Sequence, residues 1–406
     1  MQRLQAYKFQ SEPNGEQLRD LRRFAGSCRF VYNKALAKQK ENHEAGHKFM
    51  GYVAMAKHLT EWRNSSETPW LKEAPCHPLQ HALKDVERGY KNFFEKRADF
   101  PRFKKKGRSS DSFRFPDAKQ FTVDQPNSRI KLPKLGWIRY RNSREILGTA
   151  KNVTVSSKGG KWFASIQTER EVEPSIPVST TAIGIDVGIA RFATMSDGSF
   201  VAPLNSFKQQ QQRLAKYQRR MSRKVKFSSN WKKAKARIQK IHSGIAHARK
   251  DFLHKTTTTI SQNHALVCVE DLQGRKLSKS SQGTVDAPGK NVRQKSGLNR
   301  SILDQGWGEF RRQLAYKLEW NGGTLLAVPP QNTSRTCPVC GHISKENRRT
   351  QAQFLCVDCG YENNADVVGA INVLARGHRV LACGEPVLSG RSVKQEPAEA
   401  SQHALC

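Results

Sequence analysis

The stretch Gln331–Leu374 reads QNTSRTCPVCGHISKENRRTQAQFLCVDCGYENNADVVGAINVL. It contains two Cys-x-x-Cys pairs, Cys337/Cys340 and Cys356/Cys359, at a spacing typical of a four-thiolate zinc site. Four thiolates complete a tetrahedral Zn²⁺ and leave no open coordination position. We therefore interpret this segment as a structural zinc ribbon. Soon after the last thiol, Asp366 opens a helix of small and apolar residues, and the ribbon would hold that helix in place.

Two further carboxylates occur in apolar surroundings upstream. Asp186 interrupts the short apolar strand Ala182–Val187, and Glu270 ends the apolar strand His264–Glu270. A buried carboxylate is costly unless it is paired or binds a metal, so we predict that Asp186, Glu270 and Asp366 form one site. Three such carboxylates suit a two-metal nuclease, in which two Mg²⁺ ions ~4 Å apart activate water and stabilise the leaving 3′-oxygen.

Other interpretations of these carboxylates are weaker. Asp186 could be an exposed residue at a strand end, although the Asp-x-Gly context favours a metal ligand. A glycosidase also uses paired carboxylates, but the basic composition and the lack of an aromatic sugar cleft disfavour it. Asp271 adjoins Glu270 and should point to the opposite face of the strand, so we assign it no catalytic role.

The net charge indicates a polyanionic partner. Seventy Lys and Arg residues against 35 Asp and Glu residues give a net charge of +35. Nucleic acid is the simplest partner for such an excess, and a solvated basic surface is the alternative. Ser206–Lys250 contains no Asp or Glu and predicts two basic helices joined near Phe227–Asn230. Gly274–Arg300, rich in Gly, Ser, Lys and Arg, predicts a mobile basic loop, which we consider a candidate lid over the carboxylates. Beyond it, we expect one helix over Ser301–Trp320 and a strand at Thr324–Val328.

The cysteine pattern and the length of the apolar runs predict the cellular location of the protein. Nine cysteines, of which five are scattered outside the ribbon, favour reduced thiols over a disulfide framework. The N-terminus has no apolar core of signal-peptide length, and no apolar run is long enough to span a bilayer. We expect no membrane partner and a bacterial cytoplasmic location.

The N-terminal part predicts a small β-domain with a helical insertion. A strand at Gln2–Gln10 is broken before Asn14, which can cap the next helix. Further strands are expected at Arg129–Asn142 and in a hairpin at Asn152–Thr168 with a Gly-Gly turn. The expected helices lie between the first strand and these later ones: Gly15–Glu44, Tyr52–Arg63 and Leu79–Lys96, the last with Tyr90, Phe93 and Phe94 on its core side.

The segment Phe100–Phe115, FPRFKKKGRSSDSFRF, interleaves aromatic and basic residues. Such a segment can follow a phosphate backbone while its rings stack on bases. It can equally be a solvated basic loop, and the sequence does not favour either interpretation.

Several motifs together resemble the TnpB family of transposon-encoded, RNA-guided nucleases, which are related to type V CRISPR effectors. These motifs are GIDVGIARFAT, LVCVEDLQG, NTSRTCPVCG, CVDCG and ADVVGAINVL. The resemblance implies an α/β plus β fold, in which an RNase H-like (RuvC) nuclease domain contains an inserted zinc ribbon and follows a small β-barrel with a helical recognition insert. The implied boundaries are 1–10 and 113–178 for the barrel, 11–112 for the insert, 179–330 and 363–378 for the nuclease domain, 331–362 for the ribbon, and 379–406 for a disordered tail.

The resemblance also implies partners and residue roles. It implies catalytic, Mg²⁺-binding Asp186, Glu270 and Asp366, a guide RNA from the transposon end, and target double-stranded DNA cut next to a short motif. One departure is that the family commonly has an Asp-Arg-Asp-type segment where this chain reads Asn363-Asn364-Ala365-Asp366. The alternatives are an RNA-independent transposase of the same fold and a non-catalytic nucleic-acid-binding regulator.

Overall fold

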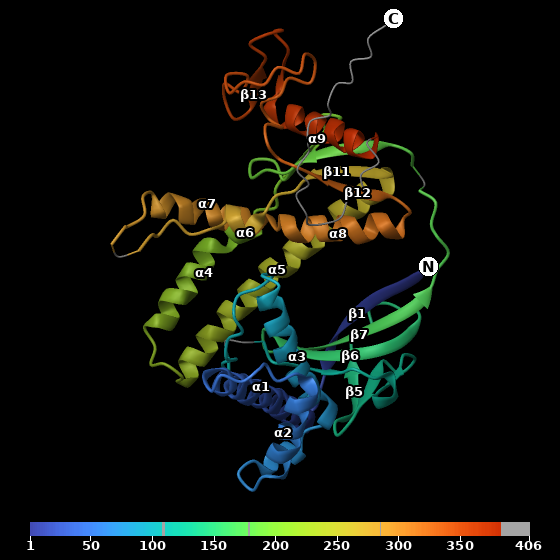
Figure 1. Ribbon diagram of the computed structural model, residues 1–406, viewed down its shortest axis with the longest axis vertical. Helices are drawn as coiled ribbons and strands as arrows, with labels where there is room; N and C mark the ends of the chain where they lie inside the picture. The colour runs from blue at the N-terminus through green and yellow to red at the C-terminus, as the bar shows by residue number, and fades with distance from the viewer. Residues whose placement is uncertain (108–109, 178, 285, 383–406) are drawn as a thin grey trace, which may run out of the picture. The chain divides into compact units, whose positions relative to one another are not determined.

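The computed structural model describes residues 1–107, 110–177, 179–284 and 286–382 (Figure 1). The chain forms two compact units. The first comprises Met1–Glu173 together with Lys235–Lys240, and the second comprises Pro174–Ala234 and the described residues from Ile241 onward. Within the described residues, no helix has the length and apolar character needed to cross a membrane.

The first unit is built on a seven-stranded antiparallel sheet. Its strand order is β2-β6-β7-β1-β5-β4-β3. The first strand pairs with β7 along ten residues, from Gln2 opposite Glu171 to Ser11 opposite Trp162, so it joins the later strands as predicted; the structure places it in the middle of the sheet. Closure of this sheet into a barrel stays a prediction. The strands are β1 (Gln2–Glu12), β2 (Ser112–Phe115), β3 (Thr122–Asp124), β4 (Arg129–Leu132), β5 (Gly136–Tyr140), β6 (Thr149–Lys158) and β7 (Lys161–Glu171).

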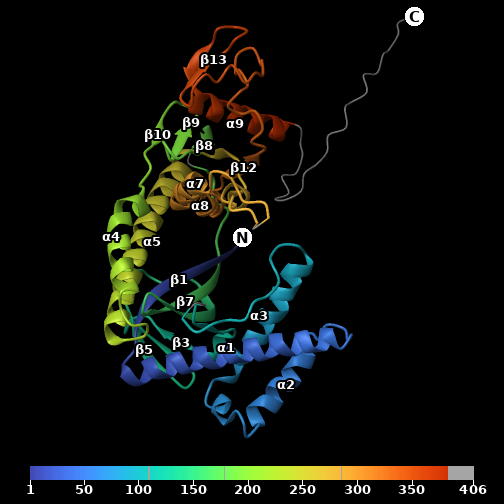
Figure 2. The same ribbon diagram turned by 90° about the vertical axis from the view of Figure 1, so that its left-hand side faces the viewer.

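Three helices pack with this sheet into one apolar core (Figure 2). They are α1 (Gly15–Glu44), α2 (Tyr52–Asn64) and α3 (Cys76–Phe94), with short 3₁₀ turns at Pro69–Lys72 and Ala118–Gln120. The predicted cap of α1 is confirmed: Asn14 accepts a hydrogen bond from the Gln17 backbone, and the Gln17 side chain accepts one from the Asn14 backbone. One expectation is wrong, because Phe93 and Phe94 at the end of α3 are exposed and do not join the core.

The second unit contains a five-stranded mixed sheet of order β10-β9-β8-β11-β12. The three strands β8 (Ala182–Asp186), β11 (Leu266–Glu270) and β12 (Thr324–Val328) run parallel. The other two strands, β9 (Ala193–Met195) and the edge strand β10 (Phe200–Val201), are antiparallel to their neighbours. Parallel strands need long crossover connections, and the helices of this unit provide them.

Helices cover both faces of this sheet (Figure 1). On one face, Ile183, Ile185, Val267 and Val269 pack against α5 (Ser229–Asn263) and α8 (Trp307–Trp320). On the other face, Cys268, Leu326 and Val328 pack against α9 (Ala365–Ala382). Successive side chains of a strand alternate between the two faces, and this alternation decides where the strand-end carboxylates point.

The predicted basic hairpin is present as α4 (Ser206–Ser222) and α5. The start of α4 has no side-chain cap of its own, and the buried Asp304 takes that role from α7 (Val292–Gln305). Its carboxylate accepts hydrogen bonds from Ser206 Oγ at 3.0 Å and from the Phe207 N–H at 2.9 Å. A carboxylate at a helix N-terminus is stabilising, so this contact attaches the basic hairpin to the rest of the unit.

Three expectations for this unit need correction. Gly274–Arg300 is not a loop throughout, because α6 (Gly274–Leu277) and the first part of α7 occupy much of it. The single helix expected over Ser301–Trp320 is two helices, since Gly306 between them adopts a left-handed φ of +76° that ends α7. Residues 379–382, expected to belong to a disordered tail, are part of α9, which continues to Ala382; the rest of that predicted tail, residues 383–406, lies outside the described residues.

Candidate functional site

Two of the three predicted carboxylates lie side by side at the ends of parallel strands. Ile185 of β8 pairs with Val269 of β11, so Asp186 and Glu270 each follow that pair by one residue. Both side chains therefore alternate onto the α9 face of the sheet. Asp271 does not, since it ion-pairs with Arg311 of α8, as expected for a residue on the opposite face.

The third carboxylate, Asp366, lies in the first turn of α9. The side chain of Asn364 accepts a hydrogen bond from the Asp366 N–H at 3.0 Å and so caps this helix. Asn363 is held by its own bond, from its amide to the Tyr361 hydroxyl at 2.8 Å. The Asn-Asn pair that departs from the family pattern thus has a structural task, which is to start the helix that carries Asp366.

Glycines allow α9 to approach the sheet very closely. A Cβ atom at Gly184, on β8, would lie 2.1 Å from the Ala370 carbonyl oxygen of α9. A Cβ atom at Gly369, on α9, would lie 3.0 Å from Oδ2 of Asp186. Both distances are shorter than normal van der Waals contact, so only glycine fits without a shift at Gly184. The close approach places Asp186 against α9, the helix whose first turn carries Asp366.

Burial and mutual repulsion characterise the electrostatics of the site. Burial raises the pKa of Asp186 to about 8, with further contributions from the neighbouring charges of Glu270 and Asp366. Burial also raises the pKa of Glu270, and a hydrogen bond from Thr333 opposes this shift. Buried like charges that repel one another are stabilised by a bound cation, so the donor set fits a divalent metal with oxygen ligands.

The side chains around the carboxylates supply few positive charges. Thr333 Oγ1 donates to Glu270 Oε1 at 2.6 Å, and Arg348 approaches Asp366 to 3.7 Å. Arg376 of α9 lies close enough to Glu270 to lower its pKa, but its guanidinium donates to the Pro329 carbonyl at 2.7 Å. These contacts orient the carboxylates and leave their summed negative charge only partly compensated.

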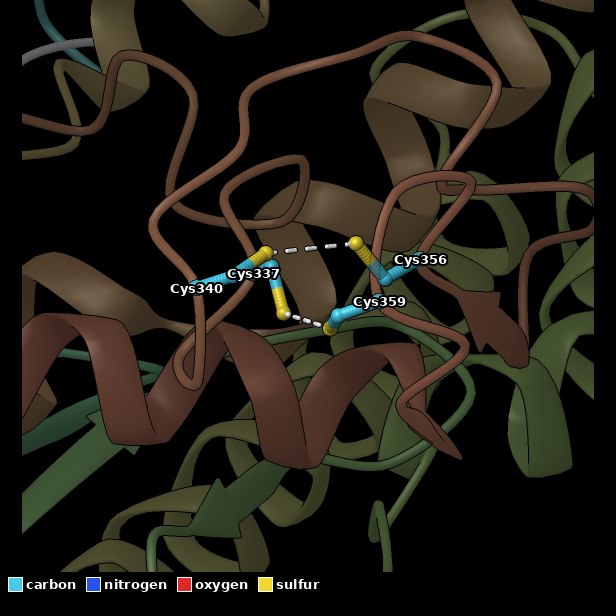
Figure 3. Close-up of side chains that lie close together, drawn as sticks. All are labelled: Cys337, Cys340, Cys356 and Cys359. Atoms are coloured by element: carbon cyan, nitrogen blue, oxygen red, sulfur yellow. Dashed lines mark hydrogen bonds between the residues drawn. The ribbon is translucent and has the colours of Figure 1, made fainter.

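The four predicted zinc ligands form a compact thiol cluster (Figure 3). The sulfur atoms of Cys337 and Cys359 are 3.6 Å apart, as are those of Cys340 and Cys356. A disulfide would bring two sulfurs to about 2.05 Å. Tetrahedral zinc with Zn–S bonds of about 2.3 Å separates them by about 3.8 Å. The spacing therefore fits Zn²⁺ and excludes disulfides.

The thiol cluster is tighter than the carboxylate group. Within the part of the chain that the structure describes, the four thiols form the group of potential metal ligands whose ligand atoms all lie within 4.8 Å of one another. The ligand atoms of the three carboxylates are spread more widely than that. The two groups therefore differ in chemistry: soft thiolates suit Zn²⁺ and carboxylate oxygens suit Mg²⁺.

The ribbon is joined to α9 by packing and by hydrogen bonds. Its two-stranded sheet consists of β13 (Gln353–Leu355) and β14 (Glu362–Asn364), and β14 leads directly into α9. Phe354 of the ribbon shares a buried cluster with Ala365 and Val368 of the helix. The Asn372 amide of α9 donates to the Thr333 and Thr336 carbonyls at 2.7 Å each. The ribbon thus fixes both the start and the middle of the helix.

Sequence reasoning missed Thr333, Gly369 and Asn364, which shape the site without being candidate ligands. Thr333 and Gly369 act on residues far away in the sequence, so local pattern gives no signal for them. Asn364 could have been found, since an Asn two positions before the first acidic residue of a helix is a known capping pattern.

Comparison with protein families gives three matches along the chain. A family model named OrfB IS605 and described as "Probable transposase" matches residues 165–281. A second, described as "Cas12f1-like, TNB domain", matches residues 307–373, and a third, described as "Helix-turn-helix domain", matches residues 1–48. In the structure this last region is the strand β1 followed by the single long helix α1.

Among the similar proteins, two match over nearly the full chain. "Putative RNA-guided DNA endonuclease InsQ" of Escherichia coli K12 is 60% identical over 402 residues, covering 99% of both chains. "Putative RNA-guided DNA endonuclease" of Streptomyces pristinaespiralis is 34% identical, covering 98% of this chain and 97% of its own. Among solved structures, CasPhi-2 (Cas12j) bound to crRNA aligns with 96% of this chain and 99% of its own, at 12% identity and a TM-score of 0.38.

Proposed function

Because this chain belongs to the TnpB family, we propose that it is an RNA-guided, Mg²⁺-dependent DNA endonuclease whose catalytic residues are Asp186, Glu270 and Asp366. The observation that supports the proposal is the position of Asp186 and Glu270, side by side on the α9 face of the mixed sheet, with the charge of Asp366 in the first turn of α9 acting on Asp186. The names of the similar sequences, which describe RNA-guided DNA endonucleases, supply the substrate and the guide.

The proposed reaction is hydrolysis of a DNA phosphodiester. A water oxygen forms a bond to phosphorus, the bond from phosphorus to the 3′-oxygen breaks, and the 3′-oxygen leaves with a proton. Asp186, Glu270 and Asp366 would hold Mg²⁺, which supplies charge stabilisation at the phosphate and lowers the pKa of water. Thr333 orients Glu270, and Gly369 leaves room for Asp186 beside α9.

The remaining parts of the molecule receive supporting roles in this proposal. The four thiols bind Zn²⁺ and keep α9 in place. The predicted β-domain (residues 1–10 and 113–178) and helical insert (11–112), which fall mostly within the first unit, hold a guide RNA from the transposon end and read the short motif beside the target. Base pairing between guide and target then supplies sequence specificity. Residues 179–330 and 363–378 form the RuvC-like nuclease domain around the ribbon.

The test combines the RNA that copurifies with the protein and cleavage of a matched target. The protein is expressed with its transposon end, the bound RNA is sequenced, and a plasmid carrying the guide-complementary sequence beside a randomised flank is incubated with Mg²⁺. We expect bound RNA from the transposon end and cut plasmid with one enriched flank. Joined transposon ends without bound RNA would instead identify an RNA-independent transposase.

Matched variants separate catalysis from binding. Asp186→Asn and Glu270→Gln remove one negative charge each and keep the side-chain volume, so cleavage should fall by at least 100-fold while affinity for nucleic acid stays within about threefold. Asp271→Asn is the control, because Asp271 adjoins Glu270 but pairs with Arg311. Binding without any cutting by the wild-type protein would identify the non-catalytic regulator.

A further inference from the structure

The end of α3 and the segment after it expose a continuous group of aromatic rings. We call Phe49, Phe93, Phe94, Phe100 and Phe103 the aromatic patch. These side chains are between 37% and 63% exposed. Single exposed apolar residues are common in proteins, but a contiguous group of large ones marks a binding surface.

Four rings of the aromatic patch contact one another, and Phe103 is joined to them through Lys40. Phe93 lies 5.5 Å from Phe94 and 5.3 Å from Phe100, measured between ring centroids. Phe49 lies 6.4 Å from Phe94, and both also contact the buried ring of Tyr90. The ammonium group of Lys40 lies over Phe103 at 4.9 Å and over Phe100 at 5.6 Å. One cation therefore already uses part of the ring surface.

The backbone beneath the rings is firmly anchored. Pro101 is buried against α3, where a Cβ atom at Gly89 would lie 3.2 Å from its ring. At Lys104, one residue beyond the patch, the side chain of Asn33 of α1 donates to the Lys104 carbonyl at 2.9 Å and accepts from the Lys104 N–H at 2.8 Å. Phe100 and Phe103 are thus presented from a fixed segment, which lowers the entropy cost of binding.

The charge around the aromatic patch selects an anionic partner. Residues 91–106 contain seven Lys or Arg residues and two acidic residues, a net charge of +5, and most of these side chains are exposed. A second copy of this chain would bring the same positive segment against itself. A partner that fits this surface must carry negative charge for the Lys and Arg residues and a flat aromatic surface for the rings. Unpaired nucleotides have both.

We propose that the aromatic patch binds unpaired nucleobases by stacking, while the surrounding Lys and Arg residues contact the adjoining phosphates. The inference depends on the proposed function only in requiring that the chain binds nucleic acid. The proposal gives a function to Phe93 and Phe94, which helical periodicity wrongly predicts to lie in the core. For the segment that begins at Phe100, it favours base stacking over a solvated basic loop.

The experiment maps where unpaired bases lie on the full-length protein. Two probes are used: the transposon-end RNA transcribed with 5-iodouridine, and a single-stranded DNA with 5-iododeoxyuridine, both of which crosslink to neighbouring aromatic residues on irradiation. Crosslinked peptides are identified by mass spectrometry. We expect crosslinks within residues 90–104, and the probe that gives them tells whether the patch holds RNA or DNA.

Four variants test whether stacking is responsible. Phe94→Ala with Phe103→Ala, and the same pair changed to Leu, should each lower the crosslink yield at the patch roughly tenfold, because stacking on a ring contributes on the order of 1–3 kcal/mol per base. The Tyr pair keeps the rings and should keep the yield. Phe200→Ala is the matched control, since Phe200 is 55% exposed beneath the Arg191 guanidinium and lies outside the patch.

Three results would overturn the proposal. Crosslinks elsewhere on the protein with none at the patch would leave nucleic-acid binding intact and remove the patch from it. Full yield in the Leu pair would exclude stacking. Loss of self-association in the Ala pair, measured by sedimentation with unchanged crosslinks, would identify the patch as an interface between copies of the chain.

Discussion

Thr333 links the zinc ribbon to Glu270 through a single hydroxyl. Its Oγ1 donates to Glu270 Oε1 at 2.6 Å, and its carbonyl accepts from the Asn372 amide at 2.7 Å. Thr333→Ala keeps the bond from Asn372 but removes the hydroxyl, which also contacts the Pro330 carbonyl at 3.1 Å, so Glu270 should lose its fixed orientation. We expect the single-turnover cleavage rate to fall roughly tenfold, with affinity for nucleic acid unchanged. Thr333→Ser keeps the hydroxyl and should restore the rate; an equal loss in both variants would show that packing of the methyl group matters instead.

Lys317 gives the fold a measurable pH dependence. Its ammonium group donates to the His254 carbonyl at 2.7 Å and to the hydroxyls of Thr257 at 2.8 Å and Thr258 at 2.6 Å. Burial nevertheless lowers the pKa of Lys317 to about 8. The unfolded chain, with an ordinary lysine pKa of about 10.4, therefore binds more protons between these values, and stability rises with pH across that window.

The measurement compares the wild type with Lys317→Met. Between pH 8 and pH 10, the unfolding free energy of the wild type should increase relative to that of the variant, by on the order of 1 kcal/mol because the group is partly exposed to solvent. Urea denaturation of the nucleic-acid-free protein at both pH values checks this. Parallel changes in the two proteins would show that Lys317 titrates normally.

At the scale of elements, the ribbon and α9 are packed together through a shared apolar cluster. Phe354, Ala365 and Val368 share a buried cluster, so loss of zinc should loosen the helix that carries Asp366. Cys356→Ser is expected to abolish zinc binding, measured by metal release, and to lower cleavage at least 100-fold. Cys76→Ser, outside the ribbon, is the control. Full cleavage by a zinc-free Cys356→Ser protein would show that α9 is held without the ribbon.

Strands were predictable where apolar residues run without interruption. The predicted strand Thr324–Val328 matches β12, and the strands bearing Asp186 and Glu270 lie within one or two residues of their predicted bounds. The start of α7 was not predictable, because it has few apolar residues and is held from outside: Lys295 donates to the Leu277 carbonyl at 2.8 Å, and Asn299 donates to that of Ser278 at 3.0 Å. Polar tertiary contacts of this kind leave no periodic pattern.

The candidate site also contains some residues that could be predicted from the sequence and others that could not. The carboxylates and thiols could be found from the sequence. Asp186 and Glu270 occur in apolar strands, and the thiols occur in two Cys-x-x-Cys pairs at the spacing of a zinc site. Their surroundings could not be found in this way, because Gly369 meets Asp186 and Thr333 meets Glu270 only after distant segments pack together. The exposure of Phe93 and Phe94 also escaped prediction, since helical periodicity does not reveal where the core beneath a helix ends.

At the scale of the whole molecule, the charge of +35 should dominate the affinity for nucleic acid. A protein that neutralises six or more phosphates loses roughly 10³-fold or more in affinity between 50 and 200 mM salt. We expect a loss of this size for the transposon-end RNA, measured by fluorescence anisotropy. Lys232→Glu with Lys233→Glu, at exposed positions of α5, should make the dependence shallower. A nearly flat dependence would show that phosphate contacts contribute little.

The position of Asp366 in the chain has a consequence for the order in which the protein becomes active. Asp186 and Glu270 emerge from the ribosome long before Asp366. On the proposed assignment, the growing chain can gather nucleic acid on its first unit and its basic hairpin well before it can cut. A copy shortened by a premature stop codon anywhere before Asp366 would therefore occupy DNA without damaging it.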